Sequence, residues 1–455
     1  MYFVLLICVM LLLFISYKFF DHDIMHPAVF LNLFFAGAIV FGFYLYNYWH
    51  LYDYGGNTTT MLLVGISSFV IGSAAAKFNR LKVKFNIGKK SNDMRNTNRG
   101  RIDIQPAMIL VAAIFSLLAF FAFIQYYRTK ISAAGIWETI LNYRINKAEE
   151  AMPGYLNIMI KIVCAFANCF VYVFVNNRIC RQSMPKDALL MIPAAAYLAM
   201  NLFIGNRGNI LILILSCFAA WYILYHRIQG WHIRLTKLFL NKGVKIALIV
   251  FILFWVFMVL MRNINVTDAR NNFMTYICSY LSGPLSGLDM YLKQGGTTCE
   301  WWGQETFVAL NNNLNSLLGI GHSSTRFLEF RSGFGYSVVN IYSSFRRFYH
   351  DFGYIGVILL SLIQGYITSR MYYIAKRKTP ASSIDLSMVI YCFFFYTVPY
   401  TLTDELFYSS NISLSGLVKL MILIIVYKFS FHGATQTPGK KVISEQRRRS
   451  LQVSR

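Results

Sequence analysis

The sequence predicts an all-α polytopic membrane protein that crosses the bilayer about 11 times. Of its 455 residues, 56% are hydrophobic and only 14% are charged, whereas a soluble domain carries about 25% charged residues. Apolar runs of about 20 residues, the length that crosses the hydrocarbon core as a helix, recur along the whole chain. These runs lack the alternation of β-barrel strands, and helices satisfy their own backbone hydrogen bonds in lipid. The spanning segments are therefore expected to be helices.

The apolar runs define the expected helices and the domain organisation. They cover residues 2–20, 27–46, 59–76, 106–126, 156–175, 188–204, 209–225, 244–261, 353–373, 384–402 and 412–429. The first eight helices lie within residues 1–261, a large polar loop covers 262–352, the last three helices lie within 353–430, and a basic tail covers 431–455. Within the loop, residues 273–291 are apolar and contain Pro284, which predicts an interfacial or re-entrant helix.

The distribution of basic residues predicts the orientation of the chain. A formal net charge of +24 suggests nucleic-acid binding, but the Lys and Arg residues lie in short segments between apolar runs rather than on one face of a domain. The most basic segments are residues 77–101, 178–186, 227–245, 376–378 and the tail, and all fall on one side if the helices alternate. Basic loops are typical of the cytoplasmic side. We therefore expect no nucleic-acid partner, a cytoplasmic C-terminus and an N-terminus on the opposite side.

The large outer loop combines cations, acids and aromatic residues, which favours the binding of an anion such as a lipid-linked pyrophosphate. The planar fork of arginine matches phosphate oxygens, so several arginines together predict an anion clamp; a solvated loop with ordinary charges is the alternative. The candidate anion ligands are Arg262, Arg326, Arg331, Arg346 and Arg347. Glycosyl transfer to a hydroxyl also requires a base, for which the candidates are His322, Glu329, His350 and Asp351.

Two of these features have a second interpretation. Asp351 directly precedes the helix expected at 353–373, so its role is either catalytic or to cap the N-terminus of that helix. Tryptophans and tyrosines of the loop either stack on sugar rings or belong to the aromatic belt at the membrane surface. The acidic pair Asp404 and Glu405, between the last two spans, is expected to form an ordinary hairpin.

Arg207 is a further candidate anion ligand. It stands between Gly205 and Gly208 in a tight turn that joins the spans at 188–204 and 209–225. Glycines allow the backbone to approach a ligand closely. The arginine is expected to contact either a substrate phosphate or a lipid headgroup. No paired-cysteine or His-Glu-x-x-His motif is present, so neither a metal nor another cofactor is expected.

Together these features resemble the O-antigen polymerases of the Wzy type, the oligosaccharide repeat-unit polymerases of Gram-negative inner membranes. The resemblance is carried by the aromatic, many-helix layout with one large late loop, by the turn at 205–209, and by the stretches at 335–342 and 351–356. It implies a fold like that of the GT-C membrane glycosyltransferases, with the large loop and the N-terminus in the periplasm.

The resemblance also implies an activity. Such enzymes polymerise undecaprenyl-pyrophosphate-linked repeat units into O-antigen polysaccharide during lipopolysaccharide biosynthesis, without a metal. The partners implied are the lipid-linked glycan donor and acceptor, membrane lipid, and a separate chain-length regulator. Arg207 is then a pyrophosphate contact, and the loop arginines are further candidates for that role. An O-antigen ligase with the same layout is one alternative. A repeat-unit flippase is another, although its short outer loops and duplicated halves are not found in this sequence.

Overall fold

The computed structural model describes residues 1–46, 54–87, 99–130, 152–229, 231, 273–296, 299–320, 322–333, 336–377 and 385–438. Within these ranges the chain is mostly helical. Six of the described helices are long and apolar enough to cross a membrane, namely Tyr2–Phe19, Gly56–Asn79, Pro106–Thr129, Gly154–Ile179, Gly208–Arg227 and Ser344–Lys376. The expectation of an all-α membrane protein is thus confirmed at the level of class. The span expected at 244–261 lies outside the described residues.

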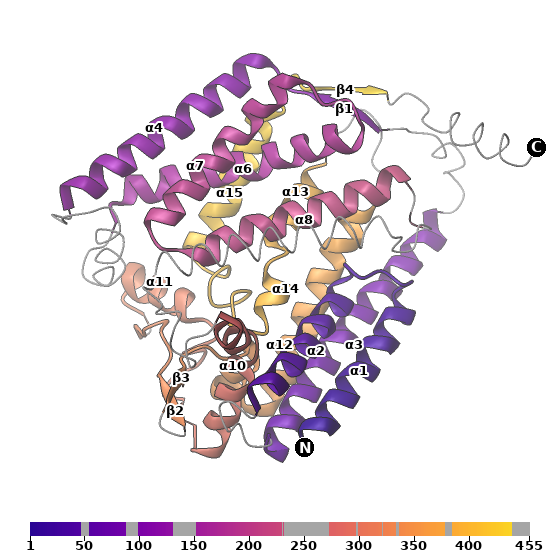
Figure 1. The fold of residues 1–455 in the computed structure, drawn as a ribbon, viewed down its shortest axis with the longest axis vertical. Coiled ribbons are helices and arrows are strands. Elements are labelled where there is room, and N and C mark those ends of the chain that lie inside the picture. The colour runs from indigo at the N-terminus through magenta and orange to yellow at the C-terminus, as the bar shows by residue number, and fades with distance from the viewer. Residues whose placement is uncertain are drawn as a thin grey trace, which may run out of the picture. The chain divides into compact units, whose positions relative to one another are not determined.

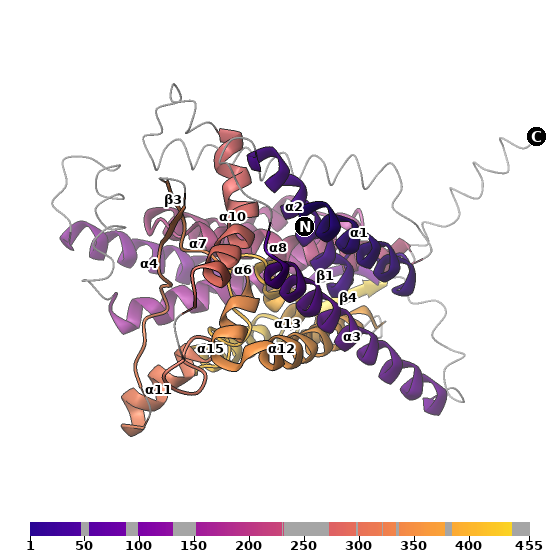
Figure 2. The ribbon, with the colours of Figure 1, turned by 90° about the horizontal axis from the view of Figure 1, so that it is seen from below.

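The chain forms two compact units. Unit 1 comprises Met1–Phe85, Leu253–Tyr373 and Phe394–Val418. Its helices and strands are α1 (Tyr2–Phe19), α2 (Pro27–Tyr46), most of α3 (Gly56–Ile87), α10 (Phe273–Lys293), α11 (Val308–Leu318), β2 (Arg331–Gly333), β3 (Tyr336–Val339), most of α12 (Ser344–Lys376), and α14 (Thr397–Tyr400). Helix α2 contacts both α1 and α10 (Figure 1). The antiparallel pair of β2 and β3 lies beside α10 (Figure 2).

Glycines bring the backbones of helices α3 and α12 together. A Cβ atom on Gly72 would collide with the carbonyl oxygen of Leu362, and one on Gly365 would collide with that of Phe69. The hydroxyl groups of Ser73 and Ser369 are 2.9 Å apart in the same region. Small residues allow such close approach between helices in lipid, where van der Waals packing drives association.

Helix α12 begins at Ser344, nine residues before the start expected at residue 353. Gly353 interrupts it with φ 62° and ψ −155°, values that a residue with a side chain rarely adopts. The first two turns of α12 are therefore set apart from its apolar part. Arg346, Arg347, His350 and Asp351 lie on this first segment, so they belong to a helix and not to a loop.

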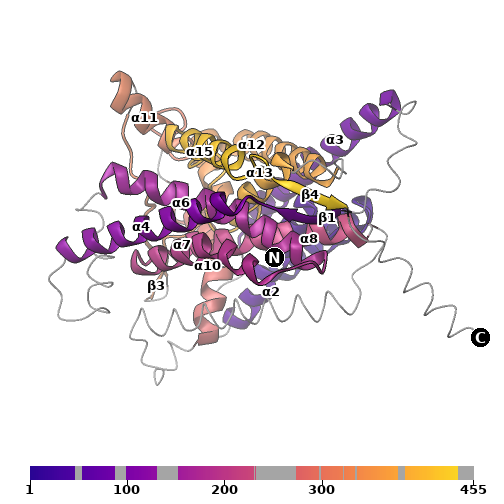
Figure 3. The ribbon, with the colours of Figure 1, turned by 90° about the horizontal axis from the view of Figure 1, so that it is seen from above.

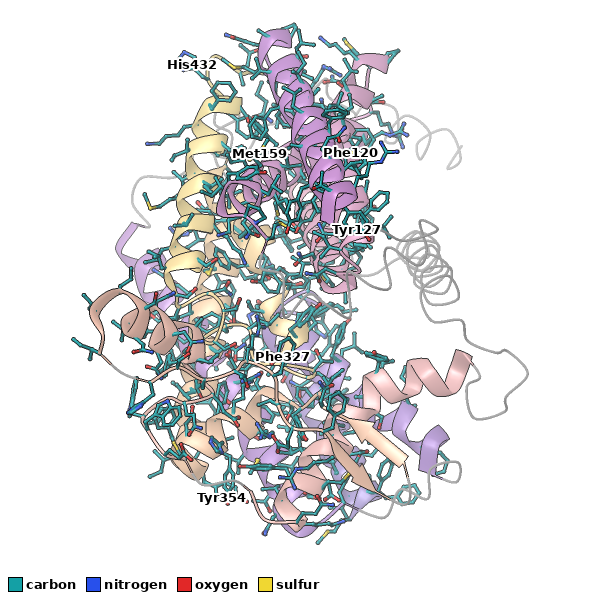
Figure 4. All side chains as sticks on the ribbon, turned by 90° about the vertical axis from the view of Figure 1, so that its left-hand side faces the viewer. Phe120, Tyr127, Met159, Phe327, Tyr354 and His432 are labelled. Atoms are coloured by element: carbon teal, nitrogen blue, oxygen red, sulfur yellow. The ribbon has the colours of Figure 1, made fainter. Side chains whose placement is uncertain are left out.

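Unit 2 comprises Asn86–Ile252, Ile374–Phe393 and Lys419–Arg455. It contains β1 (Arg99–Asp103), α4 (Pro106–Lys130), α6 (Gly154–Ile179), the 3-10 helix η3 (Pro185–Met191), α7 (Ile192–Phe203), α8 (Arg207–Gln229), most of α13 (Leu386–Phe394) and of α15 (Leu414–Ser430), and β4 (Thr435–Pro438). Strands β1 and β4 pair antiparallel (Figure 3). Phe120 and Tyr127 lie along α4 (Figure 4), and the rings of both contact Phe203 of α7.

The boundaries differ from the expected spans where helices break or extend past the apolar run. The expected helix at 188–204 is split into η3 and α7, with Pro193 in the first turn of α7. The expected helix at 384–402 is split into α13 and α14. Helix α3 runs from Gly56 to Ile87, well beyond the expected 59–76. Hydropathy identifies only the apolar part of a helix, whereas the helical backbone hydrogen bonds continue into the polar sequence beside it.

Candidate functional site

Two arginines and two glutamates of unit 1 form what we call the carboxylate–arginine cluster: Glu305, Glu329, Arg331 and Arg346. The side chain of Arg346, on the first segment of α12, is fully buried. Its two terminal nitrogens bind different carboxylates, one that of Glu305 and the other that of Glu329 at 2.7 and 2.9 Å. Arg331 donates to the same Glu329 oxygen from Nε at 3.2 Å and from a terminal nitrogen at 3.1 Å. Three separate segments are thereby joined through one guanidinium group.

Two tyrosines line this cluster. The guanidinium carbon of Arg346 lies 4.5 Å from the ring centre of Tyr291 and 4.6 Å from that of Tyr342. Arg331 also lies over Tyr291, at 5.1 Å. The hydroxyl of Tyr342 donates to the backbone oxygen of Glu329 at 2.9 Å. Cations over aromatic faces are stabilised by the ring quadrupole, so the tyrosines help to hold both arginines in place.

The cluster is neutral overall and presents one carboxylate to solvent. Burial alone raises the pKa of Glu329, but the charge of Arg346 and the hydrogen bonds from Arg346 and Arg331 outweigh it and lower that pKa. The Glu329 side chain is 36% exposed, whereas that of Glu305 is 13% exposed. Glu329 is therefore an ionised, reachable oxygen acceptor on a rigid support.

A second group, the Asp404 cluster, holds two further predicted arginines, Arg326 and Arg347. Asp404 pairs with Arg326 at 3.2 Å and with Arg347 at 3.2 Å. Arg347 is buried and also donates to the backbone oxygens of Glu305, at 3.2 Å, and Arg326, at 3.0 Å. Arg326 is far more open, with 44% of its side chain exposed.

Glu405 adjoins this second cluster and is buried. Its two carboxylate oxygens accept the backbone N–H groups of Tyr408, at 2.7 Å, and Ser409, at 2.6 Å. Burial raises its pKa to about 7, despite these two hydrogen bonds and the charge of Arg347. Asp404 and Glu405 therefore do more than close a hairpin: they anchor two arginines and the following turn.

Asp351 stands two residues before Gly353, the kink at which the apolar part of α12 begins, but its carboxylate is engaged with another segment. Its carboxylate instead accepts backbone N–H groups from Thr306, at 2.6 Å, and from Glu305, at 3.2 Å. It thus fixes the turn that carries Glu305. His350 is buried, with Nδ1 hydrogen-bonded to the hydroxyl of Tyr291 at 3.1 Å. Their role as bases stays a prediction.

The other predicted site residues lie outside the two clusters or outside the residues that the structure describes. His322 is exposed and its ring lies 4.7 Å from that of Trp301. Arg262 lies outside the described residues. Arg207 is the first residue of α8 in unit 2, after Gly205 at φ 68°, so the tight turn is present. Its side chain is outside the description, and its anion-binding role stays a prediction.

Sequence reasoning named Glu329 as a candidate base, but it did not pair Glu305, Glu329 or Asp404 with the arginines. Glu305 contacts Arg346 across 41 positions, and Asp404 contacts Arg347 across 57. The available signal was the position of Asp404 and Glu405, two adjacent acids between apolar segments, where an uncompensated charge is costly.

One further constellation has metal-binding atoms, although the sequence predicts no metal. One ligand atom from each of Cys299, His350 and Asp351 lies within 4.8 Å of the others. Cys299 follows α10, and the other two residues belong to α12. The spacing between Cys299 and His350 matches no short ligand motif, so the sequence alone did not indicate the group.

Comparisons with known proteins do not identify a family for this chain. No protein-family model matches the chain, and no curated protein and no solved structure matches it.

Proposed function

We propose that this protein is a membrane glycosyltransferase with a GT-C-like fold and about 11 crossings, which polymerises undecaprenyl-pyrophosphate-linked repeat units at the periplasmic face of a bacterial inner membrane. The observation that carries the proposal is the partly exposed, ionised Glu329 held by the buried Arg346 and by Arg331. The positive-inside pattern supports a periplasmic position for this segment.

In the proposed reaction, Glu329 is the base. A hydroxyl of the acceptor glycan attacks the anomeric carbon of the donor chain, and its proton passes to the Glu329 carboxylate. The bond between that carbon and the pyrophosphate oxygen breaks, and undecaprenyl pyrophosphate leaves. Bond breaking runs ahead of bond making in transition states with oxocarbenium character, so the acceptor hydroxyl becomes acidic late. A carboxylate with a lowered pKa is sufficient for such a proton.

The segment around Glu329 also offers groups for the remaining parts of the substrate. Arg326 is the most exposed of the arginines in the two clusters and can exchange its single contact with Asp404 for a pyrophosphate oxygen. Phe327 and Phe330 are 82% and 71% exposed on the same segment (Phe327 is labelled in Figure 4). Exposed aromatic faces suit the apolar faces of sugar rings or the lipid surface.

The proposal is tested in a strain that lacks the gene. We expect lipopolysaccharide capped with single repeat units, and a restored ladder of long chains when the wild-type gene is returned. Complete loss of O-antigen would indicate a ligase or a flippase instead, and an unchanged ladder in the deletion strain would refute polymerisation by this protein.

The role of Glu329 is tested in the same strain with a matched pair of variants. Glu329→Gln should leave single repeat units while the protein accumulates in the membrane, because the amide cannot take the proton and Arg346 keeps its pair with Glu305. Glu300→Gln changes an exposed glutamate of the same polar stretch and should restore the ladder. A full ladder with Glu329→Gln would remove this residue from the reaction.

A further inference from the structure

Cys299, His350 and Asp351 have the spacing of a preformed metal site. The sulfur of Cys299 lies 3.8 Å from Oδ1 of Asp351. In a tetrahedral zinc site, a sulfur at about 2.3 Å and an oxygen at about 2.1 Å from the metal are about 3.6 Å apart. This pair therefore already has the required separation. The whole triad, within 4.8 Å, needs a contraction of about 1 Å to reach zinc–ligand distances.

Two of the three side chains are also oriented by neighbouring groups. Oδ2 of Asp351 accepts the backbone N–H of Thr306 at 2.6 Å, and Nδ1 of His350 is hydrogen-bonded to Tyr291 at 3.1 Å. Metal-binding carboxylates and imidazoles are usually held by such outer hydrogen bonds, which fix the direction of the ligand atom. The support that polar groups give to ligands in zinc proteins is thus already formed here.

A further oxygen donor approaches the triad. Oε1 of Glu305 lies 3.8 Å from Nε2 of His350, while the other oxygen of Glu305 binds Arg346. Three protein ligands plus this carboxylate or a water molecule complete a four-coordinate set. The same glutamate would then join the metal to the carboxylate–arginine cluster.

We propose that Cys299, His350 and Asp351 bind one divalent zinc-like ion. The donor set decides the class of metal: a thiolate and an imidazole favour zinc and similar borderline ions, whereas Mg²⁺ and Ca²⁺ take oxygen ligands. Binding releases the thiol proton of Cys299 to solvent and ties the segment after α10 to the first segment of α12. The proposed glycosyl transfer is assigned to Glu329 and Arg326, so metal binding by this triad can be tested apart from that reaction.

The test uses full-length protein purified in detergent, stripped with a chelator and titrated with Co²⁺ as a spectroscopic substitute for Zn²⁺. We expect a thiolate-to-cobalt charge-transfer band in the near ultraviolet, saturation at one ion per chain, and loss of the band on addition of Zn²⁺. Absence of the band in the wild-type protein would overturn the proposal, whatever the outcome of any activity assay.

Two variants locate the ion. Cys299→Ser should abolish the charge-transfer band and weaken Zn²⁺ binding by at least about tenfold, the loss typical of a disturbed zinc site. Cys180→Ser changes another partly exposed thiol, in unit 2, and should leave both properties unchanged. A band that persists in Cys299→Ser, or that disappears in Cys180→Ser, would contradict the assignment.

Discussion

Replacement of Arg346 by methionine should destabilise the protein strongly. Arg346 is fully buried and its guanidinium group binds the carboxylates of Glu305 and Glu329. Removing one partner of a buried ion pair costs about 3–5 kcal/mol, because the remaining charge loses its compensation. Glu329 is 36% exposed, so water and Arg331 still stabilise its charge in the variant. We therefore expect a loss at the lower end of this range, about 3 kcal/mol of the free energy of unfolding.

The measurement is thermal unfolding of the purified variant in detergent, compared with Arg326→Met. Arg326 forms a single pair with Asp404 at 3.2 Å and is 44% exposed, and such pairs contribute about 0–1 kcal/mol. The midpoint temperature should therefore fall by several degrees for Arg346→Met and by much less for Arg326→Met. Equal shifts for both variants, or an unchanged midpoint for Arg346→Met, would refute the interpretation of Arg346 as the central link of the cluster.

Three further perturbations have expected outcomes. Burial raises the pKa of Glu405 from 4.5 to about 7, so between these pH values the folded state holds a proton that the unfolded state has lost. The free energy of unfolding should therefore fall by about 3 kcal/mol as the pH rises from 4.5 to 7. Glu405→Gln should remove this fall when unfolding is measured as a function of pH. Gly72→Ala should lower the midpoint of thermal unfolding, because the added Cβ meets the backbone of α12. Asp385→Asn should cost about 3–5 kcal/mol, because it leaves Arg227, paired with it at 2.7 Å, as a buried charge.

Each of these has a matched control. Glu300→Gln changes an exposed acid and should keep the pH dependence of the wild type. Gly37→Ala adds a Cβ to α2 where no atom lies within 4 Å, and should be neutral or slightly stabilising, since alanine is the better helix former. Asp21→Asn removes an ion pair in which the aspartate is 72% exposed, and should change the stability of the protein very little. A control that matches its test variant would show that the burial argument is wrong at that position.

The membrane class and several helix ends were predictable, because a run of apolar residues indicates a spanning helix without any knowledge of distant contacts. Helix α2 spans Pro27–Tyr46 as expected, with a proline at its first position, where the missing N–H costs nothing. The early start of α12 was not predictable from hydropathy. Its first segment is charged, and its helical form depends on contacts with distant residues such as Glu305 and Asp404.

The arginines of the candidate site were predictable from the sequence, but their carboxylate partners and their burial were not. The sequence places Arg326, Arg331, Arg346 and Arg347 in one polar loop, but it gives no local sign of which acids fold onto them. The structure shows all four paired with carboxylates. Burial then distinguishes the arginines. Arg346 and Arg347 are buried and stabilise the fold, whereas Arg326 is exposed enough to contact a ligand.

The most direct test of the central claim is a reconstituted polymerisation assay. Purified protein in proteoliposomes would be supplied with a synthetic polyprenyl-pyrophosphate-linked repeat unit, and the products separated by size. We predict chains of several repeat units, with one polyprenyl pyrophosphate released for each new glycosidic bond, and neither product with Glu329→Gln. If the folded wild-type protein forms no chain longer than the substrate supplied, the proposal that it is a repeat-unit polymerase is contradicted.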